Sequence, residues 1–427
     1  MTTIDEQPPR VIDPSLDPDA AIGELFFSDA GVDDPAPLYH HLRDVTPVHH
    51  SASGTVFLTR FDDCQRVLRD NHFGKAGRRR GQLLPDGDPE ATRLRAEMMR
   101  EAEARDQPQS MLFLNPPDHT RQRSLVQRAF TPKRVAELRG SIAGLADEAA
   151  DRVVDAGRGD LLDLLAFPLP VAVIGTMVGV PEADWPMFRE LITTSAAGIE
   201  PGATADELRA AERSNAEVGA YFLDLVAERR ARPQDDLLSD LIAVEEAGDQ
   251  LSEGEVIAVS ILLFAAGFET TTNLIGNGVG ALLRNPDQMR RLWADPSMLA
   301  SAVEEMLRWD SPVQLDVRSV LESTEFDGAR VEKGQQFVTL LGAANRDPAR
   351  FTDPDRFDIG RNEGQPLSFA AGIHHCLGAN LARAEAQEVF RALIERCTDI
   401  ELEGPLRRRS RMTLRGYQAV PISVTPR

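Results

Sequence analysis

Cys376 is the residue best placed to do chemistry, because it ends a loop rich in glycine and alanine, Phe369-Ala-Ala-Gly-Ile-His-His-Cys. Apolar residues follow it at intervals of four, three and four: Ala382, Ala386, Val389 and Leu393. This spacing predicts a helix directly after the loop. The dipole and the unpaired N–H groups of a helix N-terminus favour thiolate over thiol. A thiolate is the electron donor needed behind an iron that cleaves an O–O bond.

The same segment has two other interpretations. Cys376 can be an ordinary half-buried cysteine at a helix start, with Gly372 and Gly378 as turn residues. A zinc site of His374, His375 and Cys376 is less favoured, because adjacent residues rarely converge on one tetrahedral ion and no matching ligand pair stands elsewhere. In the iron interpretation, both glycines let the backbone approach a flat macrocycle closely.

A second candidate segment, Ala266-Gly-Phe-Glu-Thr-Thr271, ends an uncharged run that predicts a buried helix. Gly267 costs a helix about 1 kcal/mol relative to alanine. Glu269 is an ionisable group that needs partners or shifts its pKa if buried. Thr270 can hydrogen-bond to the carbonyl one turn earlier, which would loosen the helix and make room for a small ligand. The alternative is a helix whose polar face simply emerges at this point.

The cysteine segment resembles the haem-binding signature of the cytochrome P450 family, Phe-Gly-x-Gly-x-His-x-Cys-x-Gly. The matching positions are Phe369, Gly372, His374, Cys376 and Gly378. The resemblance implies a haem b cofactor (iron protoporphyrin IX) whose axial iron ligand is the sulfur of Cys376. The sequence departs from the signature at Ala370, where the family usually has glycine. Alanine tolerates positive φ poorly, so the loop conformation there does not carry over from the resemblance.

The second segment resembles the family's oxygen-activation motif, Ala/Gly-Gly-x-Asp/Glu-Thr-Thr/Ser. The resemblance gives Thr270 the task of holding the iron-bound oxygen species and Glu269 the task of relaying protons, and it places Ala266 among the cofactor-binding residues. It favours oxygen-dependent monooxygenation. Family members with isomerising or peroxide-driven chemistry, which often lack this pair, and a non-catalytic haem sensor or carrier are the alternatives.

Two further pairs gain a meaning from the resemblance. Glu305 and Arg308 lie three apart on a helix face and resemble the family's Glu-x-x-Arg pair, for which Arg356 stands at the position of the second arginine. Alone, such a pair would be a surface ion pair worth less than about 1 kcal/mol. His119 and Arg123 lie four apart and resemble the propionate-binding helix; the alternative is an exposed helix start. The resemblance adds Arg318 and His374 as donors to the haem carboxylates.

The elements around these residues predict a mainly α fold with a minor β region, which the resemblance identifies as the single-domain cytochrome P450 fold. We expect a disordered tail over residues 1–20 and one domain over residues 21–427. Helical periodicity dominates from residue 118 to about 308. A hairpin within 48–61, strands within 312–320 and 335–341, and a final hairpin within 404–424 complete the pattern.

Composition narrows the partners. A net charge of −21 over 427 residues argues against nucleic acid and against docking on an anionic membrane. No uninterrupted apolar run reaches the roughly 20 residues of a membrane span. Three cysteines cannot form a disulfide framework and indicate a reducing compartment. We therefore expect a soluble, cytoplasmic protein.

The chain has too few cysteines for an iron–sulfur cluster and no Gly-x-Gly-x-x-Gly motif after a strand, so electrons must come from outside. The resemblance implies a ferredoxin with its ferredoxin reductase. The expected docking residues are Arg121, Arg128, Lys133, Arg134 and Arg383. It also implies a small, largely apolar substrate, such as a secondary metabolite. The expected pocket draws on residues 76–113, 193–199, 261–265, 313–315 and 414–417.

Overall fold

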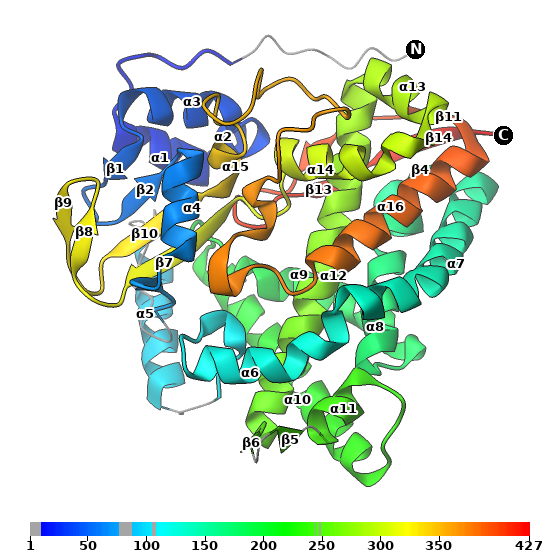
Figure 1. Cartoon of the computed structure of the whole chain (residues 1–427), viewed down its shortest axis with the longest axis horizontal. Coiled ribbons are helices and arrows are strands. Elements are labelled where there is room, and N and C mark those ends of the chain that lie inside the picture. The colour runs from blue at the N-terminus through cyan, green and yellow to red at the C-terminus, as the bar shows by residue number, and fades with distance from the viewer. Residues whose placement is uncertain (1–9, 77–87, 105–107, 244, 247–248) are drawn as a thin grey trace. The chain divides into compact units, whose positions relative to one another are not determined.

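The computed structural model describes residues 10–76, 88–104, 108–243, 245–246 and 249–427, most of them in helices (Figure 1). They form two compact units. The first contains the described residues up to Phe73, Arg139–Leu169 and Thr270–Arg427; the second contains those within Gly74–Leu138 and Pro170–Glu269. Neither unit is a contiguous stretch of chain, and the single domain over 21–427 stays a prediction. Helix α1 begins at Pro18, inside the expected tail, and residues 1–9 of that tail lie outside the described residues.

The main sheet belongs to the first unit and has the order β1-β2-β10-β7-β3 (Figure 1). Its strands are β1 Val48–His50, β2 Val56–Leu58, β3 Phe73–Gly74, β7 Leu315–Val320 and β10 Gln336–Leu340. Strands β1 and β2 are antiparallel, which confirms the hairpin predicted within 48–61. The two predicted strands are β7 and β10; they pair antiparallel, and β10 also runs parallel to β2.

The sheet's core is aromatic. The ring of Phe337 on β10 lies 4.9 Å from that of Phe73 and 5.3 Å from that of Phe326, measured between centroids. Helix α4, Phe61–Arg69, adds Phe61, Cys64, Val67 and Leu68 to the same buried cluster. Their helical spacing puts all four on one face, and removing that face from water stabilises the packing of α4 on the sheet.

Three smaller sheets complete the β region of the first unit. They are β4 Arg158–Asp160 with β11 Cys397–Leu402 and β14 Pro421–Pro426; β8 Thr324–Phe326 with β9 Ala329–Val331; and β12 Arg407–Arg408 with β13 Tyr417–Ala419. The predicted final hairpin is therefore confirmed only for β12 and β13, because β14 pairs with β11 and β4 instead.

Besides part of α12, the first unit contains the cysteine loop's helix, α16, and several other helices or parts of helices. They are α1 Pro18–Phe27, α2 Asp29–Asp33, α3 Ala36–Val45, α4, most of α7 Pro132–Ala156, α13 Pro286–Ala294, α14 Leu299–Trp309, α15 Leu341–Ala344 and α16 Ala379–Arg396. Ion pairs join α7 to α16: Arg391 and Arg396 each lie 2.9 Å from Asp147, and Arg139 lies 2.7 Å from Glu388. These pairs join residues that are 244 to 249 positions apart in sequence.

The second unit is almost entirely helical. It contains α5 Pro89–Ala104, α6 Asp118–Val126, most of α8 Pro168–Val178, α9 Trp185–Ala197, α10 Ala205–Ala231 and α11 Leu237–Ala243, with the short strands β5 Glu245–Glu246 and β6 Asp249–Gln250. Helix α10 begins with a capping box in which the Thr204 and Glu207 side chains each accept from the other's backbone N–H. The rings of Phe188 and Phe222 pack on that of Phe264, at 4.5 and 5.9 Å.

Helix α12, Glu253–Arg284, runs through both units. Within the described residues it is the one helix that is long and apolar enough to cross a membrane, by length and composition alone. Every residue from Thr271 to Leu283 is buried by protein, and a Cβ on Gly278 would lie 2.9 Å from the Phe390 ring. Its apolar character is thus that of a helix packed inside a protein, as the sequence predicts for this run.

Candidate active site

The cysteine loop consists of two 3₁₀ turns, Leu367–Phe369 and Gly372–His374, joined by a backbone that reverses at Ala370. The backbone N–H of Cys376 donates to the carbonyl of Phe369 at 3.0 Å, which closes the loop. The Cys376 side chain is exposed, and α16 begins three residues later at Ala379, as the sequence predicts. The loop therefore presents a sulfur in front of a helix N-terminus.

Two residues of the loop, Ala370 and Gly372, have positive φ angles, and the two differ in what surrounds them. Ala370 adopts φ 55° and ψ −160°, a conformation that is normal only for glycine. Gly372 has φ 71°, and a Cβ there would clash with the carbonyl oxygen of Leu68 and lie 3.0 Å from the Cα of Arg69, at the end of α4. The close approach that the structure shows at Gly372 is thus to α4. At Gly378 a Cβ would meet no protein atom within 4 Å, and the expected approach to a macrocycle stays a prediction for both glycines.

Arg383 clamps the loop from α16. Its guanidinium carbon lies 4.5 Å from the centroid of the Phe369 ring, and its Nη2 donates to Glu304 Oε2 at 3.1 Å. A cation over an aromatic face and an ion pair to α14 both hold this side chain in place. Arg383 was predicted as a docking residue, and the structure gives it a local contact inside the site.

On α12, the predicted oxygen-activation segment forms an uninterrupted helix. Glu269 is only 4% exposed, and the Thr193 hydroxyl donates to its Oε2 at 3.4 Å. A Cβ on Gly267 would lie 2.8 Å from Ile174, so this glycine permits α8 to pack closely on α12. Ala266 is exposed and Thr270 is half-buried, although most residues around them are buried. One face of α12 therefore opens at Ala266 and Thr270, which lie one turn apart.

The expected propionate donors come from both units. His119, only 2% exposed, and the half-buried Arg123 lie on α6 in the second unit, where Arg121 and Gln122 both donate to Glu255 at the start of α12. Arg318 on β7 is 1% exposed, and its Nη2 donates to Asp316 at 3.0 Å.

Arg318 also provides a test of whether this chain fits a haem. Its Nε has no hydrogen-bond partner among the residues that the structure describes. A buried N–H left without an acceptor costs free energy, so the site calls for an additional acceptor. A haem carboxylate is an acceptor of this kind, and the residues of the first unit therefore fit the cofactor.

The Glu-x-x-Arg pair is buried, and its second arginine differs from our prediction. Arg308 donates to both oxygens of Glu305, at 2.7 and 2.8 Å. The additional arginine at Glu305 is Arg361, whose Nε lies 3.1 and 3.3 Å from the two oxygens. Arg356 is exposed, because the turn at Asp353 directs its carbonyl inward to accept from Arg308 and Arg361. Burial lowers the pKa of Arg308, and Glu305 opposes that shift.

Three of the five predicted docking cations are neutralised by a neighbour. Arg121 pairs with Glu255, Arg134 with Glu137 at 3.3 Å, and Arg383 with Glu304. Lys133 and Arg128 are exposed. These residues stay candidates for docking, with less net positive charge than the sequence suggests.

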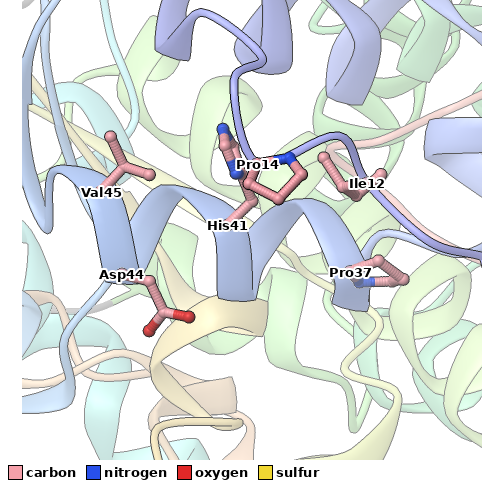
Figure 2. A pocket seen from close by; sticks show the side chains of 6 residues that line it. All are labelled: Ile12, Pro14, Pro37, His41, Asp44 and Val45. Atoms are coloured by element: carbon pink, nitrogen blue, oxygen red, sulfur yellow. The ribbon is translucent and has the colours of Figure 1, made fainter.

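The structure also contains a shallow pocket of about 300 Å³ near the N-terminal segment, shown in Figure 2. Its lining residues are Ile12, Pro14, Pro37, His41, Asp44 and Val45. None of the predicted site residues is among them, and the Nε2 of His41 is already hydrogen-bonded to the carbonyl of Leu16 at 2.8 Å. This pocket is therefore not our candidate active site.

Sequence reasoning missed Arg361 and a buried ion cluster of Asp310, Arg408 and Arg415. Arg408 stands in the run Arg407-Arg-Arg-Ser-Arg411, whose composition predicts a solvated basic surface. No local pattern marks its partner, which lies 98 residues away.

Comparison with known proteins identifies the family. The sequence model of the Cytochrome P450 family matches residues 208–410. Cytochrome P450 107B1 of Saccharopolyspora erythraea is 39% identical, over 93% of this chain and 97% of its own. Polyketide biosynthesis cytochrome P450 PksS of Bacillus subtilis is 35% identical, over 92% and 96%. A myxobacterial cytochrome P450 solved with myristic acid superimposes with a TM-score of 0.83 at 38% identity, covering 94% of this chain and 98% of its own. By this similarity along nearly its whole length, the chain belongs to the cytochrome P450 family.

Proposed function

We propose that this cytochrome P450 monooxygenase inserts one oxygen atom, by hydroxylation or epoxidation, into a small and largely apolar organic molecule. The observation that carries the proposal is the pair Glu269 and Thr270 on α12, next to the point at which Ala266 opens the helix face. A buried acid beside a half-buried alcohol is an arrangement that can hold and pass a proton. A haem sensor or an isomerase would not require it.

The family's cofactor is haem b, and when bound it supplies the iron at which molecular oxygen is activated. In this proposal the Cys376 sulfur is the iron ligand. The donors to its carboxylates are Arg318, His374, His119 and Arg123. Arg318 is the best supported of these, because its buried Nε needs an acceptor.

Three residues of the chain have separate proposed roles in the reaction: Thr193, Glu269 and Thr270. The Thr193 hydroxyl orients the carboxyl group of Glu269, which is the group proposed to transfer protons. Thr270, on the adjacent position, presents its hydroxyl to the reacting oxygen. The buried turns of α12 that follow exclude bulk water from that side of the helix.

For the substrate, the relatives indicate a chemical class. One is named for polyketide biosynthesis and another was solved with myristic acid. Of these, myristic acid is a molecule with a long apolar segment. Val313 and Leu414 are half-buried apolar residues at the predicted pocket positions, and they would contact such a segment. A secondary metabolite of this kind is the proposed substrate.

The proposed electron donor is an external ferredoxin, reduced by its reductase, in the cytoplasm. The chain's three cysteines are too few for a cluster of its own. Exposed Lys133 is the cation proposed to attract an acidic partner.

Replacing Thr270 with alanine tests the proposed function. A ligand is first selected by the spectral shift that it causes in the haem. We expect Thr270→Ala to bind it normally but to release more reducing equivalents as hydrogen peroxide and fewer as product. Glu269→Gln should slow turnover by roughly 10²–10⁴-fold, the typical contribution of a positioned proton donor.

Thr272→Ala is the matched control. Thr272 lies on the same helix, is 7% exposed, and its hydroxyl has no hydrogen-bond partner in the part of the chain that the structure describes. It should couple oxygen to product as the unmodified protein does. Equal peroxide yields from Thr270→Ala and the unmodified protein would contradict the proposal and favour peroxide-driven or non-oxygenating chemistry.

A further inference from the structure

Two segments that are distant in sequence, residues 312–314 and 413–415, form a short antiparallel junction in the first unit. Backbone hydrogen bonds of 2.8 and 3.1 Å flank a bridge between Val313 and Leu414. The residues on either side of each are buried, whereas Val313 and Leu414 themselves are half-buried. The junction therefore presents one apolar pair, which we call the Val313–Leu414 wall.

A buried charge cluster holds the base of this junction. Asp310 lies two residues before the first segment, and Arg415 is the last residue of the second. The Oδ1 of Asp310 accepts from Arg415 Nε at 2.8 Å, and its Oδ2 accepts from Arg408 Nη2. Burial alone would raise the pKa of Asp310, but the two guanidiniums overcome it and lower that pKa to about 2. All three groups are thus charged at neutral pH.

Helix α12 is joined directly to this cluster by Asn277. Its Nδ2 donates to the carbonyls of Arg415 and Asp310, at 3.1 and 3.2 Å, and its Oδ1 accepts from Arg408 Nη1 at 2.7 Å. Asn277 lies seven residues after Thr270, two turns along the same helix face. The helix that carries Thr270 therefore also fixes the segment that carries Leu414.

Asn273, one turn after Thr270, makes a second attachment. Its Oδ1 accepts from Arg409 Nη2 at 2.8 Å. A Cβ on Gly416 would lie 2.6 Å from the Cγ of Asn273, so the loop backbone rests against this side chain. Asn273 and Asn277, on one face of α12, thus fix the position of the 408–416 loop along the helix axis.

Stability alone is a weak reason for such a cluster. Two arginines share one carboxylate, so the cluster buries an excess positive charge, and desolvation offsets much of what buried ion pairs gain. The cluster does fix the relative positions of the segments that carry it, because guanidinium, carboxylate and amide groups hydrogen-bond only in defined geometries. It links the apolar wall to the catalytic helix without intervening flexible chain.

We propose that Arg408 and Asn277 are positioning residues for the substrate. They hold the Val313–Leu414 wall at a fixed place relative to Thr270, and so decide which part of an apolar substrate faces the site of oxygen insertion. The inference rests on the proposed function, since the wall has this meaning only beside a bound haem.

Two azoles that differ in size test this inference on the haem-loaded protein. Imidazole and the bulky apolar clotrimazole both bind haem iron through an imidazole nitrogen. The Kd of clotrimazole divided by the Kd of imidazole therefore reports the contacts that only the bulky groups of clotrimazole make. We expect Arg408→Lys and Asn277→Ser to weaken clotrimazole binding about tenfold, a change that reports misplaced contacts, with imidazole unchanged. Leu414→Ala should raise the same ratio by removing part of the wall itself.

Arg229→Lys is the matched control. Arg229 is 7% exposed against 8% for Arg408, and it also donates to a buried aspartate, Asp236, at 2.6 Å. Its other partners are the Gly179 carbonyl at 2.6 Å and Glu228 at 3.0 Å. It has no link to α12 or to the wall in the described structure, and its variant should leave the ratio unchanged.

Two results would overturn the inference: an unchanged ratio in both Asn277→Ser and Leu414→Ala, or an equal rise in Arg229→Lys. Asn277→Ser removes no charge, so it keeps the test decisive where Arg408→Lys fails to fold. An unmodified protein that gives no spectral shift with imidazole would contradict the proposed function, and this inference with it. A shift with an unchanged ratio would contradict the inference alone.

Discussion

Burial raises the pKa of the Cys64 and Cys397 thiols, so both stay protonated at neutral pH. The Cys64 thiol also donates to the carbonyl of Leu58 at 3.4 Å, which occupies it. Cys376 differs from both, because it is exposed and stands before the N-terminus of α16. At the scale of single residues, environment rather than residue type therefore separates the proposed iron ligand from the two structural cysteines.

Ala370→Gly should relieve strain in the cysteine loop. The alanine holds φ 55° and ψ −160°, and such a conformation costs a residue with a Cβ on the order of 1–3 kcal/mol. Glycine adopts it freely, so this variant should unfold at a higher denaturant concentration than its control. The haem spectrum should not change, because the backbone path stays the same.

The control is Ala371→Gly, at a residue with φ −149° and ordinary extended backbone. Both variants lose a methyl group and gain unfolded-state freedom, which costs about 0.5–1 kcal/mol. Only Ala370 carries the strain, so the difference between the two isolates it. If Ala370→Gly is destabilised as much as Ala371→Gly, the loop stores no strain at this position.

At the scale of the helix, α16 carries an unexpected acid on its buried face. Glu385 is 2% exposed, and its Oε2 has no hydrogen-bond partner within the described part of the chain. Burial raises the pKa of this carboxyl well above its usual value. The folded state thus binds the proton more tightly than the unfolded state, and stability is lost as pH rises from the unfolded pKa through the folded one.

Glu385→Gln should therefore stabilise the protein increasingly as pH rises. At pH 8 we expect a gain on the order of 1 kcal/mol, because an unpartnered buried carboxylate is replaced by a neutral group of the same shape. Near pH 4.5 the gain should vanish, since both side chains are then neutral. Urea unfolding at several pH values measures it.

Glu388→Gln supplies the comparison on the same helix. Glu388 is also buried, but it pairs with Arg139 and Arg391, both at 2.7 Å. Its loss should destabilise the protein at pH 8, since two arginines lose a charged partner. A stabilisation by Glu385→Gln that does not depend on pH would mean that this carboxyl is not protonated in the folded state.

The same helix shows which features local sequence can predict. The spacing of Ala386, Val389 and Leu393 predicts α16 correctly, because the buried face of a helix follows from its period alone. The arginine opposite Glu305 is different: Arg356 and Arg361 lie in one polar loop, and only the path of the turn at Asp353 decides which side chain points inward. That path depends on tertiary contacts that no local pattern encodes.

At the scale of the whole molecule, ion pairs reduce the positive charge that the sequence predicts for the docking surface. A net charge of −21 predicts repulsion of acidic partners, and five cations near the site predict a local exception. Sequence cannot say which cations are neutralised, because their partners are far along the chain: Glu255 lies 134 residues from Arg121, and Glu304 lies 79 residues from Arg383. The structure thus gives three of the five cations an acidic neighbour, and the docking prediction now rests mainly on exposed Lys133.

Reversing the charge of Lys133 to glutamate should slow reduction by an acidic ferredoxin at low salt. Local positive charge speeds and orients the encounter more than it strengthens binding, so the reduction rate should fall while turnover driven by added peroxide stays the same. At about 1 M salt the Debye length is only about 3 Å, so the variant and the unmodified protein should be reduced at similar rates. Stopped-flow reduction under carbon monoxide measures the rate directly.

Lys333→Glu is the control for net charge. Lys333 is an exposed lysine between β9 and β10, and its replacement by glutamate makes the net charge more negative at a different place on the surface. It should slow reduction much less than reversal at Lys133. Arg383→Glu should instead alter the haem spectrum, because Arg383 contacts Phe369 in the cysteine loop and pairs with Glu304. If reversal at Lys133 and at Lys333 slows reduction equally, the effect belongs to total charge, and the ferredoxin does not dock through Lys133.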